Sequence, residues 1–274
     1  MQAPWSWARK AMSHRNHDET TVPDRWQRLW ARPRGAALRH RLARPIAFVR
    51  ARLSPRGYLG LHLTLGALTL VGASWLFGGI AEDVVTGDPL TVVDAHVAAW
   101  FHARTIPLLT LPMLLITNLH GTWSITVLSL ALAIVLIRQR AWYWLQALVL
   151  VVPGGMLLNV LTKHAFRRAR PDFADPILVL TTYSFPSGHV AAATLLYGLL
   201  AAIIVTRIDA WGSRVLVGLL ALLAVTLVAL SRLYLGAHYL SDVLAGFAES
   251  TAWLALCLTA MHTWRRHRGA GYRG

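Results

Sequence analysis

The chain has few cysteines, few acidic residues and few lysines. Its single cysteine, Cys257, excludes an intrachain disulfide framework. Charged residues make up 14% of the 274 positions, about half the share in an ordinary soluble domain. Apolar residues make up 55%, and the mean hydropathy is +0.48, which excludes a disordered chain and a coiled coil. We therefore expect an integral membrane protein.

Positive charge is concentrated outside the apolar stretches. The chain carries 27 Lys and Arg against 12 Asp and Glu. Residues 1–57 have a net charge of +10, and residues 263–274 contain four arginines. Charge placed beside apolar spans is the positive-inside pattern and not a nucleic-acid groove, so no nucleic-acid partner is expected. Both segments are interpreted as basic cytoplasmic tails, the first of them flexible and without the apolar core of a signal peptide.

Six apolar stretches are long enough, or nearly so, to cross about 30 Å of hydrocarbon as helices. These predicted spans are 58–78, 121–137, 141–162, 189–206, 213–231 and 239–260. Residues 106–120 contain two prolines and would reach only ~22 Å as a helix, so they are expected to be interfacial or re-entrant, after an amphipathic helix near 92–103. The predicted fold is an all-α polytopic membrane domain over 58–262, with six transmembrane helices and a short extracytoplasmic amphipathic segment.

The distribution of charge predicts which way the spans run. Six spans put both termini on one side, and that side then carries +17 while the opposite side carries −1. We expect the side with the termini to be cytoplasmic, in the cell (inner) membrane. Two spans separate the loop 163–188 from the corner 232–242, so both lie on the extracytoplasmic face.

Cationic residues on this outer face point to an anion site. Lys163, Arg170 and Arg232 would form a positive pocket, for which a tetrahedral oxyanion is the natural occupant. Ser187 and Gly188 precede an apolar helix. The serine could cap that helix, and the free backbone N–H groups at the start of the helix could hold an anion. Taken one by one, such residues are usually topology anchors or caps, but their meeting on one face favours a shared site.

Two histidines and an aspartate on the same face could supply the chemistry. His238 and Asp242 are four residues apart on one helical face. The carboxylate can then accept a hydrogen bond from one ring nitrogen, which leaves the other free as a nucleophile or base. His189 falls in the first turn of its helix, where it could protonate a leaving group.

These residues resemble the motifs of the type 2 phosphatidic acid phosphatase superfamily, a family of lipid phosphate phosphatases. The family pattern is Lys, six residues, Arg-Pro; then Pro-Ser-Gly-His; then Ser-Arg, five residues, His, three residues, Asp. Every specified position matches in order, as KHAFRRARP at 163–171, PSGH at 186–189 and SRLYLGAHYLSD at 231–242. The active site is therefore expected within 163–242.

The resemblance implies a role for each matched residue. His238 would be the nucleophile that carries a phosphohistidine intermediate, oriented by Asp242, and His189 would be the general acid that later activates water. The phosphoryl oxygens would be held by the remaining motif residues, which are Lys163, Arg170, Ser187, Gly188 and Arg232. No metal and no cofactor are implied.

The resemblance implies a metal-independent phosphatase that acts on an outer-leaflet lipid phosphate. Undecaprenyl diphosphate is the first candidate, with phosphatidylglycerophosphate, phosphatidate and a lipid A phosphate as competitors. One alternative is a lipid phosphotransferase that uses the same intermediate. Another is a non-catalytic headgroup-binding or flippase-like protein. Vanadium-dependent haloperoxidases share the motifs but are soluble proteins.

Four further polar residues have open interpretations. Arg167 and Arg168 could hold a second phosphate or be solvated. Asn159 could fix Lys163 through a hydrogen bond or make an amide contact between helices. Glu249 could be functional or support helix packing. The oligomeric state is left undetermined by the sequence.

Overall fold

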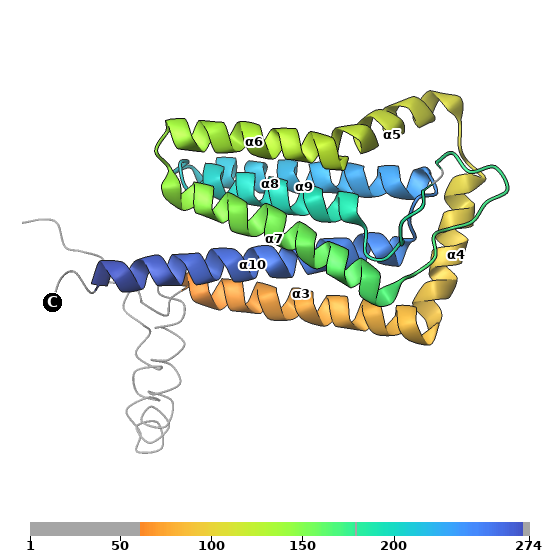
Figure 1. The fold of residues 1–274 in the computed structure, drawn as a ribbon, viewed down its shortest axis with the longest axis horizontal. Helices are drawn as coiled ribbons and strands as arrows, with labels where there is room; N and C mark the ends of the chain where they lie inside the picture. The colour runs from red at the N-terminus through yellow and green to blue at the C-terminus, as the bar shows by residue number, and fades with distance from the viewer. Residues whose placement is uncertain (1–60, 179, 271–274) are drawn as a thin grey trace, which may run out of the picture. The chain divides into compact units, whose positions relative to one another are not determined.

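The structure, a computed structural model, describes residues 61–178 and 180–270, with side chains from residue 62 to residue 266 of these ranges. This part of the chain is helical and contains no strand. The helices, labelled as in Figure 1, are α3 (Leu61–Thr86), α4 (Pro89–His102), α5 (Pro107–Leu119), α6 (Thr122–Arg138), α7 (Trp142–Phe166), α8 (Gly188–Val205), α9 (Trp211–Tyr234) and α10 (Leu240–Ala270).

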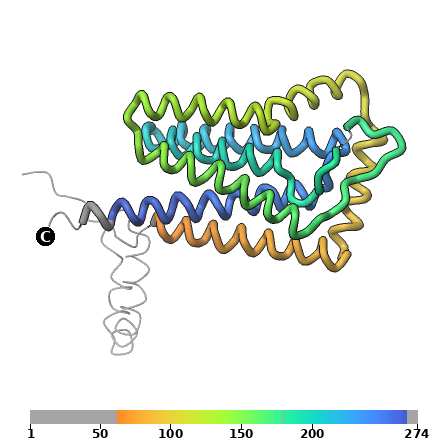
Figure 2. The backbone as a smooth tube through the Cα atoms, in the orientation of Figure 1, coloured from red at the N-terminus to blue at the C-terminus, as the bar shows by residue number. Residues whose placement is uncertain are grey.

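Six of these helices run side by side, and two short ones close one end. Helices α3 and α6 to α10 form a bundle, while α4 crosses the end at which α3 finishes (Figures 1 and 2). Helix α5 follows α4 and is bent by 50° from α6 at a short break. The α7–α8 loop and the α9–α10 corner lie at the same end as α4. The bundle therefore brings three distant chain segments to one place.

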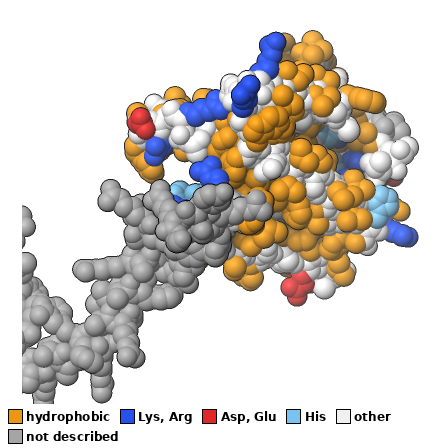
Figure 3. All heavy atoms as spheres, turned by 60° about the vertical axis from the view of Figure 1, so that its left-hand side comes forward, with side chains coloured by type: hydrophobic (Ala, Val, Ile, Leu, Met, Phe, Trp, Pro, Cys, Tyr) orange, Lys and Arg blue, Asp and Glu red, His pale blue; other side chains and the backbone are white. Residues whose placement is uncertain are grey.

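The apolar character of the helices is that of membrane spans. Helices α3, α7, α8, α9 and α10 are long and apolar enough to cross a membrane, and α5 with α6 can supply a sixth, bent span. Large apolar side chains cover much of the surface of the described bundle (Figure 3). The prediction of an all-α, multi-pass fold is confirmed, and the six predicted spans fall on α3 and α6 to α10.

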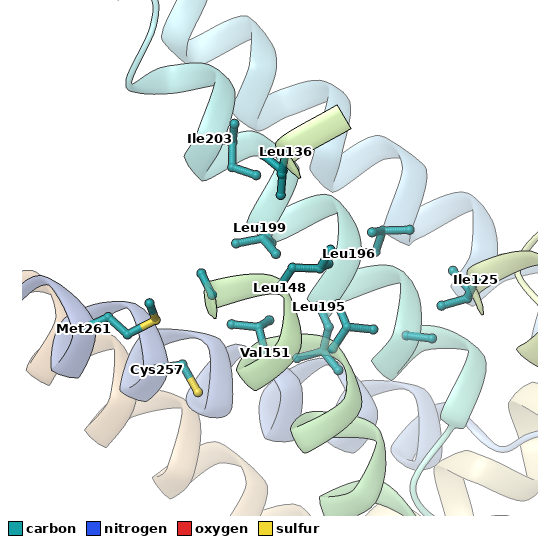
Figure 4. Packing of buried hydrophobic residues seen from close by; sticks show 13 residues of the cluster. Ile125, Leu136, Leu148, Val151, Leu195, Leu196, Leu199, Ile203, Cys257 and Met261 are labelled. Carbon is teal, nitrogen blue, oxygen red and sulfur yellow. The ribbon is translucent and has the colours of Figure 1, made fainter. Parts of the chain in front are cut away.

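Helix α8 is the central helix of the core. Its Leu195, Leu196 and Leu199 are no more than 1% exposed, and Figure 4 shows them beside Leu148 and Val151 of α7. Because lipid tails are as apolar as leucine, van der Waals packing between these side chains holds the helices together in a membrane. A tightly packed α8 gives its first turn, which begins at Gly188, a fixed position.

Two helices extend beyond the predicted spans. Helix α3 continues to Thr86 instead of ending near residue 78, and stops where Gly87 adopts a positive φ of 79°. Helix α10 continues to Ala270, past the tail boundary expected at 262. The expected amphipathic helix near 92–103 is α4, and residues 106–120 form α5. The predicted tail 1–57 lies outside the described residues.

Candidate active site

The three motif segments meet at the end of the bundle that α4 crosses (Figure 1). Lys163 lies in the last turn of α7, and Gly188 begins α8. The start of α10 packs directly on the loop that leads into α8. A Cβ atom on Gly246 would lie 2.6 Å from the Ser187 carbonyl oxygen, so only glycine allows this approach. The Ser187 N–H donates to the Asp242 carbonyl oxygen at 2.9 Å.

His238 lies at the centre of the site with one ring nitrogen toward a carboxylate. It is 2% exposed. Its Nδ1 atom is 3.4 Å from Asp242 Oδ2, and its Nε2 atom is 3.3 Å from Arg170 Nη1. Burial lowers the pKa of His238 to about 3; Asp242 opposes this shift, and Arg232 and Arg170 add to it. The ring is therefore neutral, and contact with a guanidinium donor is typical of an unprotonated Nε2.

Asp242 is held by three donors, two from the α7–α8 loop and one from the α9–α10 corner. Its carboxylate accepts hydrogen bonds from Arg168 Nη1 at 2.8 Å and from the Tyr239 N–H at 2.8 Å. It also accepts a hydrogen bond from the Ser184 hydroxyl. The side chain of Asp242 is fully buried. These bonds fix its orientation and therefore the direction of the His238 ring.

Arg168 connects Asp242 to a second buried carboxylate. Its Nη2 donates to Asp94 Oδ2 at 2.7 Å, and its guanidinium lies over the Tyr239 ring at 4.5 Å. Asp94 also accepts from the N–H and hydroxyl of Ser241, at 2.8 and 2.5 Å. Burial works against the charge of Arg168, but Asp242 and Asp94 outweigh it and raise the pKa of Arg168. The charge of Arg168 is thus shared by two carboxylates.

This link was missing from the sequence-based prediction. Of the two interpretations of Arg168, solvation is wrong, because its side chain is 14% exposed and is bound to Asp94 and Asp242; binding of a second phosphate stays a prediction, which these ion pairs disfavour. Arg167 is exposed and its Nε donates to the His164 carbonyl oxygen at 3.0 Å. The one available signal was a carboxylate among the apolar residues of the predicted amphipathic helix at Asp94.

The other cations of the predicted pocket do converge. Arg170 donates to the Ala237 carbonyl oxygen at 2.5 Å and to the Thr182 carbonyl oxygen at 2.7 Å. Burial lowers the pKa of Arg170, with Asp242 opposing the shift. Arg232 is 2% exposed, and its Nη1 donates to Thr117 Oγ1 at 2.5 Å. Its Nε, although buried, has no hydrogen-bond partner among the described residues.

Lys163 is directed to the turn before α8. Its Nζ donates to the Pro186 carbonyl oxygen at 2.6 Å and to the Tyr183 carbonyl oxygen at 3.1 Å. These bonds tie the end of α7 to the loop that carries the second motif. The third N–H donates to the Ser184 carbonyl oxygen at 3.5 Å, so all three donors of the ammonium face the same loop.

Ser187 does not make the predicted cap. It occupies the N-cap position of α8, but its side chain makes no capping hydrogen bond. The residue is fully buried, and its hydroxyl has no partner among the described residues. Because a buried hydroxyl is costly to leave unpaired, this donor suits a ligand at the start of α8. The free N–H groups of the first turn, which starts at Gly188, suit the same ligand.

His189 follows in the first turn of α8 and faces the break between α5 and α6. A Cβ atom on Gly121 would lie 4.0 Å from His189 Nε2. Nearby, His120 Nε2 is 2.7 Å from the Tyr197 hydroxyl. The bend between α5 and α6 thus forms part of the wall beside the predicted general acid.

Asn159 and Glu249 form a separate buried network behind Lys163. The Asn159 side-chain N–H₂ donates to Glu249 Oε2 at 3.0 Å, and Thr162 Oγ1 donates to Glu249 Oε1 at 2.6 Å. The suggested hydrogen bond from Lys163 to Asn159 is absent, since the Asn159 amide oxygen has no partner in the described chain. Glu249 therefore joins α10 to α7 through polar groups and supports the helix that carries Lys163.

Comparisons with known proteins agree with the motifs. A model of the PAP2 superfamily matches residues 141–266, which include all three motifs. Phosphatidylglycerophosphatase B of Bacillus subtilis (strain 168) is 38% identical over 107 residues, which are 38% of this chain and 52% of the relative. The chain thus spans about half the length of this curated relative.

Two crystal structures share the fold. A transmembrane PAP2 type phosphatidylglycerolphosphate phosphatase from Bacillus subtilis superimposes with a TM-score of 0.64 at 27% identity, over 70% of this chain and 94% of that one. Aquifex aeolicus LpxE gives a TM-score of 0.50 at 21% identity, over 61% and 94% of the two chains, a likeness of fold alone. All three motifs lie at one end of the transmembrane helical bundle, within the residues 141–266 that match the PAP2 superfamily model.

Proposed function

We propose that the protein is a membrane lipid phosphate phosphatase that works through a phosphohistidine on His238. The observation that carries this proposal is the placement of His238, with Nδ1 toward Asp242 and Nε2 toward Arg170 at 3.3 Å. A neutral imidazole held in this way presents the Nε2 lone pair beside a cation. That is the arrangement needed to attack a phosphorus atom whose oxygens are held by positive charge.

The first half of the reaction forms a covalent intermediate. The Nε2 lone pair of His238 attacks phosphorus, and the bond between phosphorus and the lipid oxygen breaks. His189 donates a proton to the departing lipid oxygen. The positive charge that develops on the His238 ring is stabilised by Asp242, which Arg168 and Ser184 hold in place.

The second half regenerates the enzyme. His189, now neutral, accepts a proton from a water molecule as the water oxygen attacks phosphorus. The bond between phosphorus and His238 Nε2 breaks, and inorganic phosphate is released. Both halves pass through a trigonal-bipyramidal arrangement whose equatorial oxygens need donors.

The donors for those oxygens are the groups without a full set of protein partners. The Ser187 hydroxyl and Arg232 Nε are buried and unpaired in the described chain. Arg170 Nη1 can exchange its contact with His238 for a phosphoryl oxygen, and Lys163 Nζ can exchange its long contact with the Ser184 carbonyl oxygen, 3.5 Å, for another. Such fixed donors lower the barrier because they need no reorientation as charge develops.

For the substrate we propose a lipid phosphomonoester, with phosphatidylglycerophosphate as the first choice. The relative's name, Phosphatidylglycerophosphatase B, supports that choice. A diphosphate such as undecaprenyl diphosphate is the second candidate, because Arg168, the residue considered for a second phosphate, is bound to Asp94 and Asp242. Following the charge distribution, we place both termini in the cytoplasm and this site at the extracytoplasmic face of the cell membrane.

Phosphate release from a lipid panel tests the function. The purified full chain in detergent is assayed with phosphatidylglycerophosphate, undecaprenyl diphosphate, phosphatidate and lipid A, beside His238→Ala. We expect release by the wild type, with phosphatidylglycerophosphate ranked first, and none by the variant. Vanadate should inhibit, because it mimics the phosphoryl transition state, and EDTA should not. Equal release by folded His238→Ala would contradict the proposal.

The same assay separates the two alternatives. A phosphotransferase would release little phosphate until an acceptor lipid or sugar is added. A headgroup-binding protein would bind the lipids without any turnover. Phosphate release in the absence of an acceptor is the result that supports hydrolysis.

A further inference from the structure

A second polar region lies at the opposite end of the bundle, where α3 and α7 begin and α8 and α10 end. It is a cavity of about 500 Å³. Figure 3 is turned so that this end comes toward the viewer, and basic and histidine side chains lie there among apolar ones. The residues that line the cavity include Leu63, Tyr143, Trp144, Thr259, His262 and Arg265. None of the three sequence motifs reaches this region.

The chemistry of the cavity wall favours an anion. Arg265, Arg266, His62 and His262 are among the described lining residues, which include no Asp or Glu. The Nε2 atom of His262 is buried and has no hydrogen-bond partner in the described chain. A cavity whose described wall is basic and holds no carboxylate gains stability when a negatively charged ligand enters.

Aromatic rings lie beside Arg265, His62 and His262. The Arg265 guanidinium lies 4.8 Å from the centroid of the Tyr143 ring. The His62 and His262 rings pack with their centroids 4.9 Å apart. A guanidinium that lies over an aromatic ring uses its flat face for this contact. Its N–H donors point outward in the guanidinium plane, where they can bind the oxygens of an anion.

The position of the cavity across the membrane identifies the source of the anion. Asp242, in the first turn of α10, belongs to the catalytic end, and His262 lies twenty residues further along that helix. At 1.5 Å per residue the two are separated by about 30 Å, which is about the thickness of the hydrocarbon core. The cavity therefore lies where the headgroups of the other leaflet lie, and Trp144 and Tyr143 match the aromatic residues that favour this boundary.

We propose that this cavity binds the phosphate of an anionic phospholipid from the leaflet opposite the active site. Its lining has a polar part for the headgroup and an apolar part, with Leu63, Val205 and Leu258, for the start of an acyl chain. Free phosphate would use only the polar part. The cavity is separate from the site of the proposed phosphatase activity, so the two proposals can fail independently.

Lipid retention measured by native mass spectrometry tests this site. The full chain is released from detergent that contains phosphatidylglycerol, phosphatidylcholine or inorganic phosphate. We expect retention of phosphatidylglycerol, with at least a tenfold weaker apparent affinity in Arg265→Gln, which corresponds to about 1.4 kcal/mol. His262→Gln is the second variant if Arg265→Gln does not fold.

Two matched controls locate the binding. Arg138→Gln removes an exposed arginine that is not among the lining residues, at the end of α6. Lys163→Gln alters the catalytic end, where phosphatidylglycerol could also be retained. Both should retain phosphatidylglycerol like the wild type. Equal retention by Arg265→Gln, equal retention of phosphatidylcholine, a loss confined to Lys163→Gln, or binding of phosphate alone would each overturn the proposal.

Discussion

The two ends of the helical bundle both contain arginines, but they surround them differently. At the end with the candidate active site, Arg168 lies between the buried carboxylates of Asp94 and Asp242. At the opposite end Arg265 lies over the Tyr143 ring, and the described lining of the cavity includes no Asp or Glu. Paired charges fix geometry, as orienting a nucleophile requires, whereas cations without carboxylates are suited to binding an anion from outside.

Among the substitutions that test this comparison of the two ends, Asp242→Asn is expected to lower the activity most. The substitution removes the charge that stabilises the His238 ring and leaves Arg168 with one carboxylate. We expect kcat to fall by about 10³-fold with KM nearly unchanged, since the loss falls on the transition state. Steady-state phosphate release measures both constants. A rise in KM alone would assign Asp242 to substrate binding.

Ser187→Ala should have the next largest effect. Because the Ser187 hydroxyl makes no capping bond, its removal should leave the melting temperature unchanged. The loss of one transition-state donor should lower kcat by about 10²-fold. Activity assays and thermal unfolding distinguish the two roles. A lower melting temperature with full activity would show that the serine acts as a helix cap.

Asp94→Asn tests the role of the carboxylate that binds Arg168 on the side away from Asp242. The amide keeps a hydrogen bond to Arg168 but loses the charge, so the orientation of Asp242 should relax without collapse of the site. We expect kcat to fall about tenfold. This is the lower end of the loss seen when a residue that orients a catalytic group, without touching the substrate itself, is replaced. Retention of activity by Asp94→Asn together with its loss in Asp94→Leu would show that the hydrogen bonds of residue 94, and not its charge, hold the site.

The smallest expected effect is spectroscopic. Burial lowers the pKa of His238 from 6.5 to about 3, so its ring should stay neutral at pH 5 while an exposed histidine is largely protonated. The ¹⁵N shifts of the ring, assigned by comparison with His238→Gln, report this directly. Because the unfolded chain binds this proton more tightly, the site lowers stability as the pH falls from 6.5 toward 3. A protonated ring at pH 5 would contradict the neutral nucleophile.

The sequence predicted the helical membrane fold and the candidate catalytic cluster for different reasons. Long apolar stretches define spans without any knowledge of packing, so α7, α8 and α9 fell close to their predicted ranges. The three motifs lie at span ends on one face, and counting spans was enough to bring His189, His238 and Asp242 together. Both predictions depend only on local composition and on the rule that two loops separated by an even number of spans lie on the same side of the membrane.

What the sequence did not reveal depends on contacts across the bundle. Asp94 and Arg168 are 74 positions apart, and no periodicity links a carboxylate on α4 to an arginine after α7. The pairing of Asn159 with Glu249 likewise depends on the packing of α7 against α10. Ser187 has the residue type of a helix cap, but burial of its hydroxyl without a partner is visible only in three dimensions.

Trapping the phosphoenzyme is the most direct test of the central claim. His189→Ala is mixed with p-nitrophenyl phosphate, whose good leaving group needs little acid catalysis, and is quenched in base, which preserves phosphohistidine. Intact-mass and peptide mass spectrometry should show an added mass of about 80 Da on His238, because no group remains to activate water. His238→Gln should show none. No phosphoryl group on His238, or one on another residue, would contradict the account.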